Sequence, residues 1–164
     1  MKNKTFSIQF YEVEGITQLP EDEQMLVQEA NRMTENAYAP YSKFYVGAAI
    51  LLDNGEIIKG SNQENGAYPS GLCAERVAAF AASAMYPGAV MKKIAVSATS
   101  ERLLPKGPVS PCGACRQVLL EYESAQQSPL KVLLAGKNGK IYIIEKMKDL
   151  LPLDFSGKDL KNNR

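Results

Sequence analysis

Alternating apolar and polar positions near the start of the chain predict its first strand. Residues 5–13 (TFSIQFYEV) alternate with a period of two, which is typical of a half-buried strand. From Pro20 the period changes. After an acidic first turn, apolar side chains recur at helical spacing, at Met25, Leu26, Ala30, Met33 and Ala37. The pattern therefore predicts an N-terminal strand followed by an amphipathic helix.

A hairpin and then an alternation of helices and strands follow. Residues 46–52 form an apolar run, Asp53-Asn-Gly55 is a turn signal, and residues 56–60 are the second strand of the predicted hairpin. We further expect helices at 73–85 and 112–123, strands at 93–98, 130–135 and 140–144, and loops at 62–72 and 100–111. This order predicts an α/β fold with a mixed sheet and helices on its faces. Residues 1–20 are assigned to an N-terminal extension and residues 21–164 to one domain.

The composition fits one compact domain in a reducing compartment. At 164 residues the chain can bury a substantial core. Its 19 Lys and Arg residues nearly balance 18 Asp and Glu residues, so we expect neither nucleic acid nor an anionic membrane as a partner. Residues 1–20 lack the apolar run of a signal peptide, and no segment is long enough to span a bilayer. Together with the odd number of cysteines, this predicts a cytoplasmic protein.

Three cysteines and no histidine define the candidate chemistry. Cys73 lies in a Cys-Ala-Glu segment, and Cys112 and Cys115 lie in Pro-Cys-Gly-Ala-Cys. Three thiolates leave a tetrahedral zinc ion one ligand short, and an open position is the mark of a catalytic site. Glu75 follows Cys73 by two residues, where a carboxylate can move protons for water that the metal activates. The pattern predicts metal-assisted hydrolysis.

Both cysteine segments fall where a loop enters a predicted helix, which favours thiolates. Backbone N–H groups are free at a helix start, and the helix dipole lowers the pKa of a thiol there. Arg76 and Arg116 each follow a ligand segment directly. A guanidinium that donates hydrogen bonds to the sulfurs would offset the net negative charge of three thiolates on one dication. We favour Arg76 for this role over Arg116.

Two simpler interpretations compete with a catalytic metal. Cysteines of a cytoplasmic protein can be small buried apolar residues, and a lone Cys-x-x-Cys at a helix start can be a thioredoxin-like redox pair. Neither interpretation has a use for the third cysteine or for the glutamate that follows it. The complete pattern therefore favours zinc.

With these motifs the chain resembles the small, three-cysteine, homotetrameric cytidine deaminases. The resemblance lies in five segments: APYSKFYVGAA at 39–49, NQEN at 62–65, CAER at 73–76, PCGACRQVL at 111–119 and LLPLDF at 150–155. It implies a three-layer α/β/α fold with a mixed five-stranded sheet, to which the strand at 5–13 would add a sixth. It also implies one zinc ion per subunit and a glutamate as proton shuttle. The ligands would be Cys73, Cys112 and Cys115, and the shuttle Glu75.

The resemblance also implies which residues bind the substrate. Asn62 and Glu64 match the pair that hydrogen-bonds the ribose hydroxyls, and Phe44 matches the aromatic residue that packs against the pyrimidine. Without a nucleoside, the first two would belong to a solvated turn, and Phe44 would be an ordinary core residue. A site built to bind those hydroxyls would reject a free base, because its buried polar groups would lose their partners.

Three further positions would complete the pocket across subunits. Gly66 and Tyr68 fall where a neighbouring subunit's loop closes the site. Phe155 matches a C-terminal aromatic residue that reaches into another subunit's site. On this basis the resemblance implies a homotetramer with shared active sites. The alternative for Phe155 is a tail anchor that packs on its own chain.

The predicted function is hydrolytic deamination of cytidine and deoxycytidine to uridine and deoxyuridine, a reaction of pyrimidine salvage. Water activated by zinc attacks C4 of the ring while Glu75 moves the protons. Deamination of another aminopyrimidine, such as blasticidin S, is the alternative within the same chemistry. A base-flipping editing domain usually has a histidine among its ligands, and this chain has none. A zinc-binding module without catalysis is the alternative from a different class.

Overall fold

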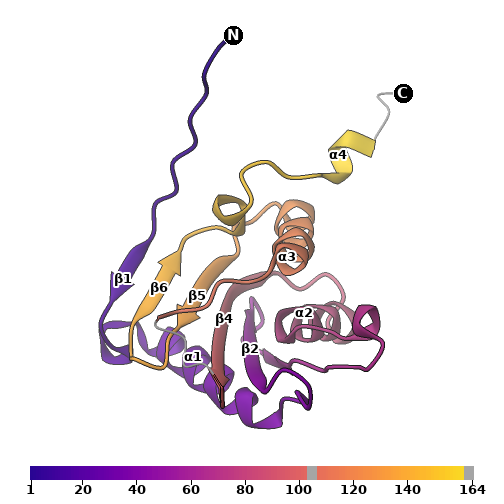
Figure 1. Cartoon of the computed structure of the whole chain (residues 1–164). Coiled ribbons are helices and arrows are strands. Elements are labelled where there is room, and N and C mark those ends of the chain that lie inside the picture. Colours follow the sequence, from indigo (N-terminus) through magenta and orange to yellow (C-terminus); the bar gives the residue numbers. More distant parts are fainter. Residues whose placement is uncertain (103–106, 161–164) are drawn as a thin grey trace.

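The computed structural model describes residues 1–102 and 107–160, so residues 103–106 of the loop expected at 100–111 lie outside the described residues. Figure 1 shows the helices and strands in place. In chain order they are β1 (Tyr11–Val13), α1 (Glu21–Met33), β2 (Phe44–Leu52), β3 (Ile57–Ser61), α2 (Ala74–Met85), β4 (Met91–Ser100), α3 (Gly113–Gln126), β5 (Lys131–Ala135), β6 (Ile141–Ile144) and α4 (Gly157–Leu160). Among the described helices, none has the length and apolar content needed to cross a membrane.

The strands form one mixed sheet in the order β1-β6-β5-β4-β2-β3. β4 and β5 run parallel, and the other neighbours run antiparallel. The sheet therefore has six strands, and the sixth is the added N-terminal strand. That strand is shorter than the alternation at 5–13 predicts, because only Tyr11–Val13 pairs with β6. Residues 5–10 extend away from the sheet (Figure 1).

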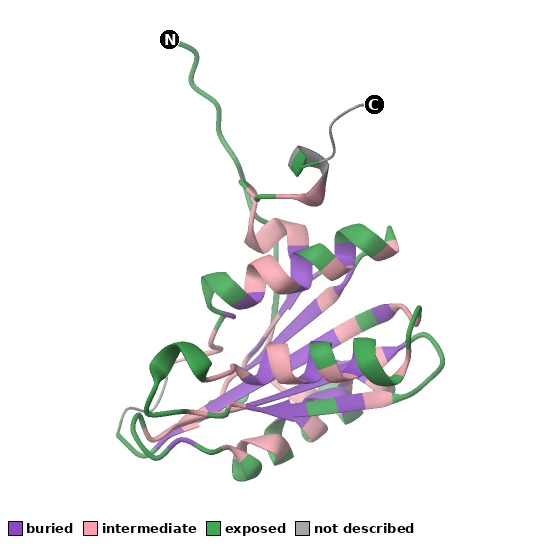
Figure 2. Cartoon of the chain, turned by 90° about the vertical axis from the view of Figure 1, so that its right-hand side faces the viewer, coloured by how far each residue is buried: buried purple, intermediate pink, exposed green. Residues whose placement is uncertain are grey.

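Helices cover both faces of the sheet, as expected for an α/β/α fold. Successive side chains of a strand point to opposite faces, and in β2 this separates two cores. Ala48, Ile50 and Leu52 pack with α2 and α3 in one core. Ala49 packs with α1 in the other, where Leu26 contributes from the helix. Figure 2 shows the buried residues concentrated in the strands between these layers.

Small residues bring α2 very close to the sheet. A Cβ atom at Gly60 in β3 would lie 2.5 Å from the carbonyl oxygen of Ala74 and 2.6 Å from the backbone nitrogen of Ala78. The alanines that face the sheet are themselves fully or almost fully buried. Contacts this short are possible only where one partner has no side chain, so Gly60 fixes the height of α2 above the sheet.

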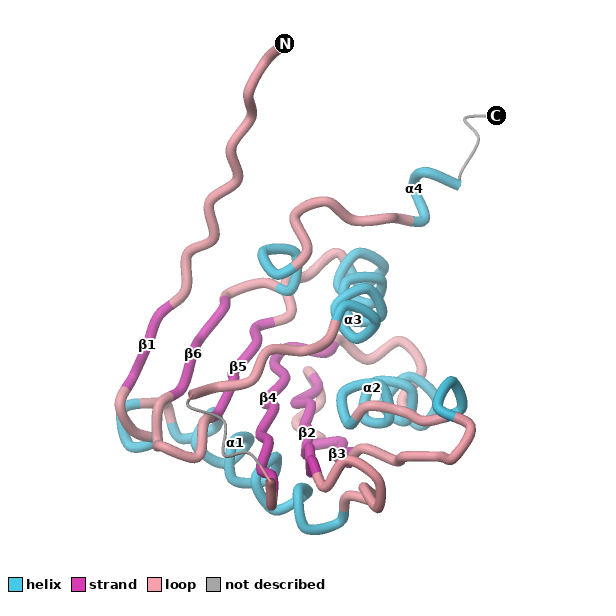
Figure 3. Tube along the Cα trace, in the orientation of Figure 1, coloured by secondary structure: helices cyan, strands magenta, loops and turns pink. Residues whose placement is uncertain are grey.

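A buried carboxylate positions the other helix on this face, α3. Glu123 accepts backbone hydrogen bonds from Leu130 at 2.8 Å, from Met147 at 2.7 Å and from Lys148 at 3.0 Å. It thereby ties α3 to the start of β5 and to the short helix Met147–Leu150. The chain enters α2 from a loop (Figure 3), and Gly60 and Glu123 hold α2 and α3 in place on this face of the sheet.

Gly60→Ala tests the close packing of α2. The added methyl group would force the helix outward, and overpacking of this kind costs about 1–3 kcal/mol of unfolding free energy. Because Cys73 and Glu75 lie at the start of α2, we also expect less zinc per purified chain. Gly15→Ala is the matched control, since its Cβ would be 3.9 Å from the nearest heavy atom. Equal stability and equal zinc content in the two variants would contradict the argument.

Candidate metal centre and adjoining cavity

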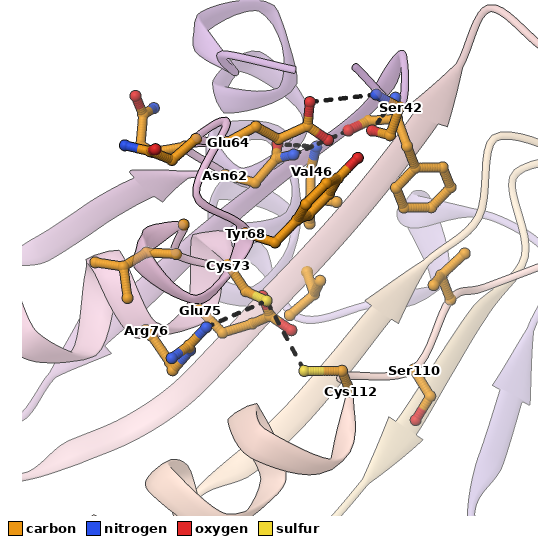
Figure 4. A pocket seen from close by; sticks show the side chains of 17 residues that line it. Ser42, Val46, Asn62, Glu64, Tyr68, Cys73, Glu75, Arg76, Ser110 and Cys112 are labelled. Atoms are coloured by element: carbon orange, nitrogen blue, oxygen red, sulfur yellow. Dashed lines mark hydrogen bonds between the residues drawn. The ribbon is translucent and has the colours of Figure 1, made fainter. Parts of the chain in front are cut away.

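The three cysteines meet where α2 and α3 begin. Cys73 directly precedes α2, Cys112 directly precedes α3, and Cys115 lies in the first turn of α3. Their sulfur atoms all lie within 4.8 Å of one another. The Sγ atoms of Cys73 and Cys112 are 3.8 Å apart (Figure 4). Sulfurs at about 2.3 Å from a tetrahedral zinc ion are separated by roughly this distance, so the arrangement fits zinc.

The donor set and its charge also fit this metal. Thiolates are soft ligands, and three of them leave one tetrahedral position for water or substrate. Hydrogen bonds from the Cys115 thiol and from the Arg76 guanidinium outweigh burial and lower the pKa of Cys73 to about 5. The same pairing raises the pKa of Cys115, with burial and the nearby Glu75 carboxylate adding to the effect. Negative charge is thus favoured on the Cys73 sulfur, beside Arg76.

Of the two arginines, Arg76 is the one beside the sulfurs. Its Nη2 atom lies 3.9 Å from the Cys73 Sγ atom. Its Nε atom is buried and has no hydrogen-bond partner in the described part of the chain. Arg116 instead donates to the Pro111 carbonyl at 2.8 Å and, with its other nitrogens, to the Leu150 carbonyl and the Ser110 hydroxyl. Arg116 therefore holds the loop before α3, and Arg76 is placed to balance the thiolates.

Glu75 lies beside the cysteine cluster and is buried. Only 4 % of its surface is exposed, and its carboxylate lies close to Cys73 in Figure 4. Burial raises its pKa, and the negative charge of Cys73 adds to the rise. A carboxyl group in such surroundings can both hold and release a proton, which is what a general acid–base catalyst requires.

A cavity of about 550 Å³ opens beside the cluster, within the range of roughly 300–1,000 Å³ that small-molecule sites occupy. Cys73, Cys112 and Glu75 form one end of it, while Cys115 is fully buried behind. The other predicted residues in its wall are Phe44, Asn62, Glu64, Tyr68 and Arg76. The structure thus brings eight of the eleven predicted site residues to one cavity wall (Figure 4).

Glu64 is held by the loop that precedes β2. Its Oε2 atom accepts the backbone N–H of Tyr41 at 2.9 Å and that of Ser42 at 3.2 Å. Burial alone would raise its pKa, but hydrogen bonds from Ser42 and Tyr41 bring the pKa below its ordinary value. The side chain is therefore a fixed carboxylate, and these two backbone bonds use only one of its oxygens.

Asn62 is committed to the backbone of β2. Its Oδ1 atom accepts the N–H of Val46 at 2.8 Å, and its Nδ2 atom donates to the carbonyl of Phe44 at 2.9 Å. An amide nitrogen carries two hydrogens, so one donor remains beyond these bonds. Asn62 thus fixes the start of β2, and with it the place of Phe44 in the cavity wall.

The loop at 39–43 contributes to the cavity wall at a position, Ser42, that the sequence did not predict as a site residue. Ser42 lines the cavity, and Lys43 adopts a left-handed conformation with φ of 55°. A side chain in that region is uncommon and costly, and such strain collects at functional sites. Val109 and Ser110, from the segment before α3, also line the cavity. Serine and lysine in a loop gave no pattern that distinguishes them from ordinary turn residues.

Three predicted positions lie at the margin of the cavity or away from it. Tyr68 lines the cavity of its own chain but is 74 % exposed, and its ring is tilted against Tyr41 with centroids 6.2 Å apart. Gly66 lies beside the same tyrosine, since its Cβ would be 3.2 Å from the Tyr41 hydroxyl. Phe155 is 61 % exposed and lies outside the described cavity wall. The roles expected of these residues across subunits stay predictions.

The residues of the metal centre lie within the part of the chain that matches a known protein family. The family model "Cytidine and deoxycytidylate deaminase zinc-binding region" matches residues 20–128. The chain belongs to this deaminase family. The match includes all three cysteines, so the metal of the centre is zinc, one ion per chain. The resemblance drawn from the motifs is confirmed.

Relatives in the family cover most of the chain. It is 41% identical to a cytidine deaminase of Halalkalibacterium halodurans over 141 residues, which is 86% of this chain and 99% of the relative. It is 44% identical to one of Sporosarcina psychrophila over 140 residues, which is 85% and 95% of the two chains. The crystal structure of a cytidine deaminase from Burkholderia pseudomallei superposes with a TM-score of 0.70 at 40% identity, covering 80% of this chain and 97% of that one. The α/β deaminase fold is thereby confirmed.

Arg76→Ala tests the balance of charge at the zinc centre. Without the guanidinium, the thiolates keep more negative charge and the cluster loses a positioning contact. Outer partners of this kind are worth 10- to 100-fold in metal affinity, so we expect a chelator to remove zinc about tenfold faster. The measurement is zinc release to a chromophoric chelator, with Arg32→Ala on the surface of α1 as the control. Identical release from both variants would refute the role.

Proposed function

We propose that the chain hydrolyses cytidine and deoxycytidine to uridine and deoxyuridine, with release of ammonia, as a zinc-dependent enzyme of pyrimidine salvage. The observation that carries the proposal is the cavity with the cysteine cluster and buried Glu75 at one end and the fixed Glu64 carboxylate near the other. The names of the relatives, cytidine deaminases over almost their full length, support the same reaction.

The reaction divides between the metal and Glu75. When bound, zinc lowers the pKa of water and so supplies a nucleophile near neutral pH. Glu75 takes the proton that the attacking water releases and donates it to N3 of the ring, which makes C4 electrophilic. It then takes the second proton of the same water, from the oxygen now bonded to C4, and delivers it to the amine, which leaves as ammonia while C4 becomes a carbonyl. Its burial keeps solvent from competing for these protons.

The far end of the cavity suits a nucleoside better than a free base. Glu64 has an oxygen beyond its two backbone bonds that can accept a sugar hydroxyl, and Asn62 has one amide hydrogen left to donate. The half-buried ring of Phe44 is available to pack against the pyrimidine. A substrate without a sugar would not supply this further hydrogen bond to the charged, partly desolvated Glu64, and the site would bind that substrate weakly.

We further infer that the enzyme works in the cytoplasm as a homotetramer with shared active sites. Exposed apolar side chains near the cavity and on the C-terminal segment support an interface. Tyr68 is 74 % exposed at the cavity wall, and Leu153 and Phe155 are 77 % and 61 % exposed in the segment after η4 (Met147–Leu150). Burial of these groups by neighbouring subunits would close the site against solvent.

Glu75→Gln tests the proton shuttle. The amide keeps the size of the side chain but cannot carry a proton between water and the ring. We expect turnover of cytidine to fall by about 10²- to 10⁴-fold, the range typical of a lost general acid–base group, with zinc content and melting temperature unchanged. Loss of the cytidine absorbance band measures turnover, and atomic absorption measures zinc. Turnover near that of the wild type would eliminate Glu75 as the shuttle.

The same assay separates the alternatives for the whole protein. Conversion of cytidine and deoxycytidine by the zinc-loaded wild type supports the proposal. Conversion of blasticidin S or another aminopyrimidine, with cytidine left intact, would move the enzyme to a different substrate. A zinc-loaded chain that converts none of them would be a binding module.

Glu64→Gln tests recognition of the sugar. A hydrogen bond to a charged group is worth about 1.5–3 kcal/mol, so kcat/KM for cytidine should fall roughly 10- to 150-fold. The amide oxygen can still accept a backbone hydrogen bond from Tyr41 or Ser42, so the fold is expected to persist. Glu56→Gln, in the β2–β3 turn, is the control. An unchanged kcat/KM in Glu64→Gln would show that the sugar is recognised elsewhere.

A further inference from the structure

Residues 1–10 form an extended arm that projects beyond the sheet. Figures 1 and 2 show the arm leaving the body of the molecule above β1. Phe6, Ile8 and Phe10 are 59 %, 48 % and 52 % exposed on it. The Phe10 ring packs on Tyr142 of β6 with centroids 4.9 Å apart, yet about half of Phe10 and of the other two side chains stays exposed, which is costly in water. The arm also lies before residue 20, where the match to the deaminase family begins.

The arm continues into a strand with an open edge. β1 pairs with β6 on one side and is the last strand in the sheet order, so its other edge offers free backbone groups. The alternation of residues 5–13 has the period of a strand, yet residues 5–10 have no neighbouring strand in the described chain. The segment thus has the pattern of a strand and lacks a partner for it.

The even-numbered side chains of this segment form a self-complementary series. In a strand they would share one face. In order they are Lys2, Lys4, Phe6, Ile8, Phe10, Glu12 and Glu14. The series is basic at one end, apolar in the middle and acidic at the other end. Two such strands placed antiparallel bring each basic end to the other's acidic end.

We propose that residues 2–14 of two copies of this chain pair as antiparallel strands about a two-fold axis at Ile8. The pairing extends the sheet of each copy through the open edge of β1. Each Lys4 then lies opposite Glu12 of the partner subunit, and each Lys2 opposite Glu14 of the partner subunit. Each Phe6 lies opposite Phe10 of the partner subunit, and the two Ile8 side chains meet at the axis. Opposite charges and apolar pairs facing one another stabilise a sheet.

Other registers lose this match. An axis at residue 7 would place Lys4 opposite Phe10, and an axis at residue 9 would place Phe6 opposite Glu12. An axis between two residues would put every apolar side chain of the series opposite an odd-numbered residue, such as Ser7 or Gln9. Slipping a strand by one residue turns its apolar set to the other face, so register is strongly specified here.

The charge already present at β1 leaves room for the partner's lysines. Glu12 and Glu14 both reach Lys140, with carboxylate oxygens 2.7 Å and 3.1 Å from its Nζ atom. Two carboxylates share one ammonium group, so these three groups together carry a net charge of −1. In the proposed register, Lys2 and Lys4 of the partner subunit give each carboxylate a cation of its own in addition to Lys140.

The geometry also keeps the two bodies apart. Val13 would lie opposite residue 3 of the partner subunit, ten residues from the partner's own Val13. At about 3.4 Å per residue, the two β1 strands are offset by about 34 Å along the strand direction. That is close to the diameter of a small domain, so each body can lie beyond the end of the other's arm.

Cysteine cross-linking of the full, zinc-loaded chain tests the register. Directly opposite residues have Cα atoms about 4.5–5.5 Å apart, which suits a disulfide, whereas diagonal neighbours are roughly 7–8 Å apart. Ile8→Cys should therefore form a cross-linked dimer under mild oxidation at least about tenfold faster than Ser7→Cys or Gln9→Cys alone. A mixture of Ser7→Cys and Gln9→Cys chains should cross-link, because these residues face each other. The wild type gives the background from the native thiols.

The rates of cross-linking decide whether the two arms pair in this register. Fast linking of Ile8→Cys and of the mixture, slowed when Lys2→Glu and Lys4→Glu are added, supports the paired arms. Equal linking of all three single variants would mean random collision, and no linking above the wild-type background would mean that the arms do not meet. Either result overturns the proposal.

Discussion

The meeting of two helix starts is the constraint on which the site depends. Zinc tolerates errors of only about 0.2 Å in its ligand distances. Its ligands nevertheless lie at the starts of α2 and α3, between which the chain forms the whole of β4. Each helix is therefore held in place by its own contact with the rest of the fold. Gly60 lets α2 sit directly on β3, and Glu123 ties α3 to three backbone N–H groups. The metal links two elements that the fold has already aligned.

The charges around the zinc follow from the same convergence. Two helix N-termini point at the cluster, and Arg76 adds a positive charge beside Cys73. These groups offset thiolates that would otherwise leave the zinc a weak Lewis acid. Glu75 lies in the same small volume, where burial favours its neutral form. The result is a centre of low net charge, suited to an uncharged substrate that must be protonated and attacked in one place.

The chemical groups of the site could be predicted from the sequence more completely than the contacts that hold them in place. Cys73, Cys112, Cys115 and Glu75 could be predicted because their spacing relative to helix starts carries the information. The role of Glu123 could not be predicted, since it depends on which distant N–H groups the fold brings within reach. The N-terminal strand was predicted too long for a similar reason. Its alternation is genuine, but β6 pairs with only Tyr11–Val13, and a strand exists only where a neighbour accepts its hydrogen bonds.

The end of the cavity around Glu64, where we propose that the sugar binds, is organised before any substrate arrives. The Tyr38 N–H donates to the Asn62 carbonyl at 2.9 Å, and the Glu64 N–H donates to the Tyr38 carbonyl at 2.8 Å. Together with the bonds from Asn62 to β2, they cross-tie two loops that would otherwise be free to move. A nucleoside that binds there orders little that is not already ordered, so more of its binding free energy remains for aligning C4 with the catalytic end. The same ties explain the division of labour between the two polar residues. Asn62 uses both of its polar atoms on the backbone of β2, whereas Glu64 stays a carboxylate in the cavity wall.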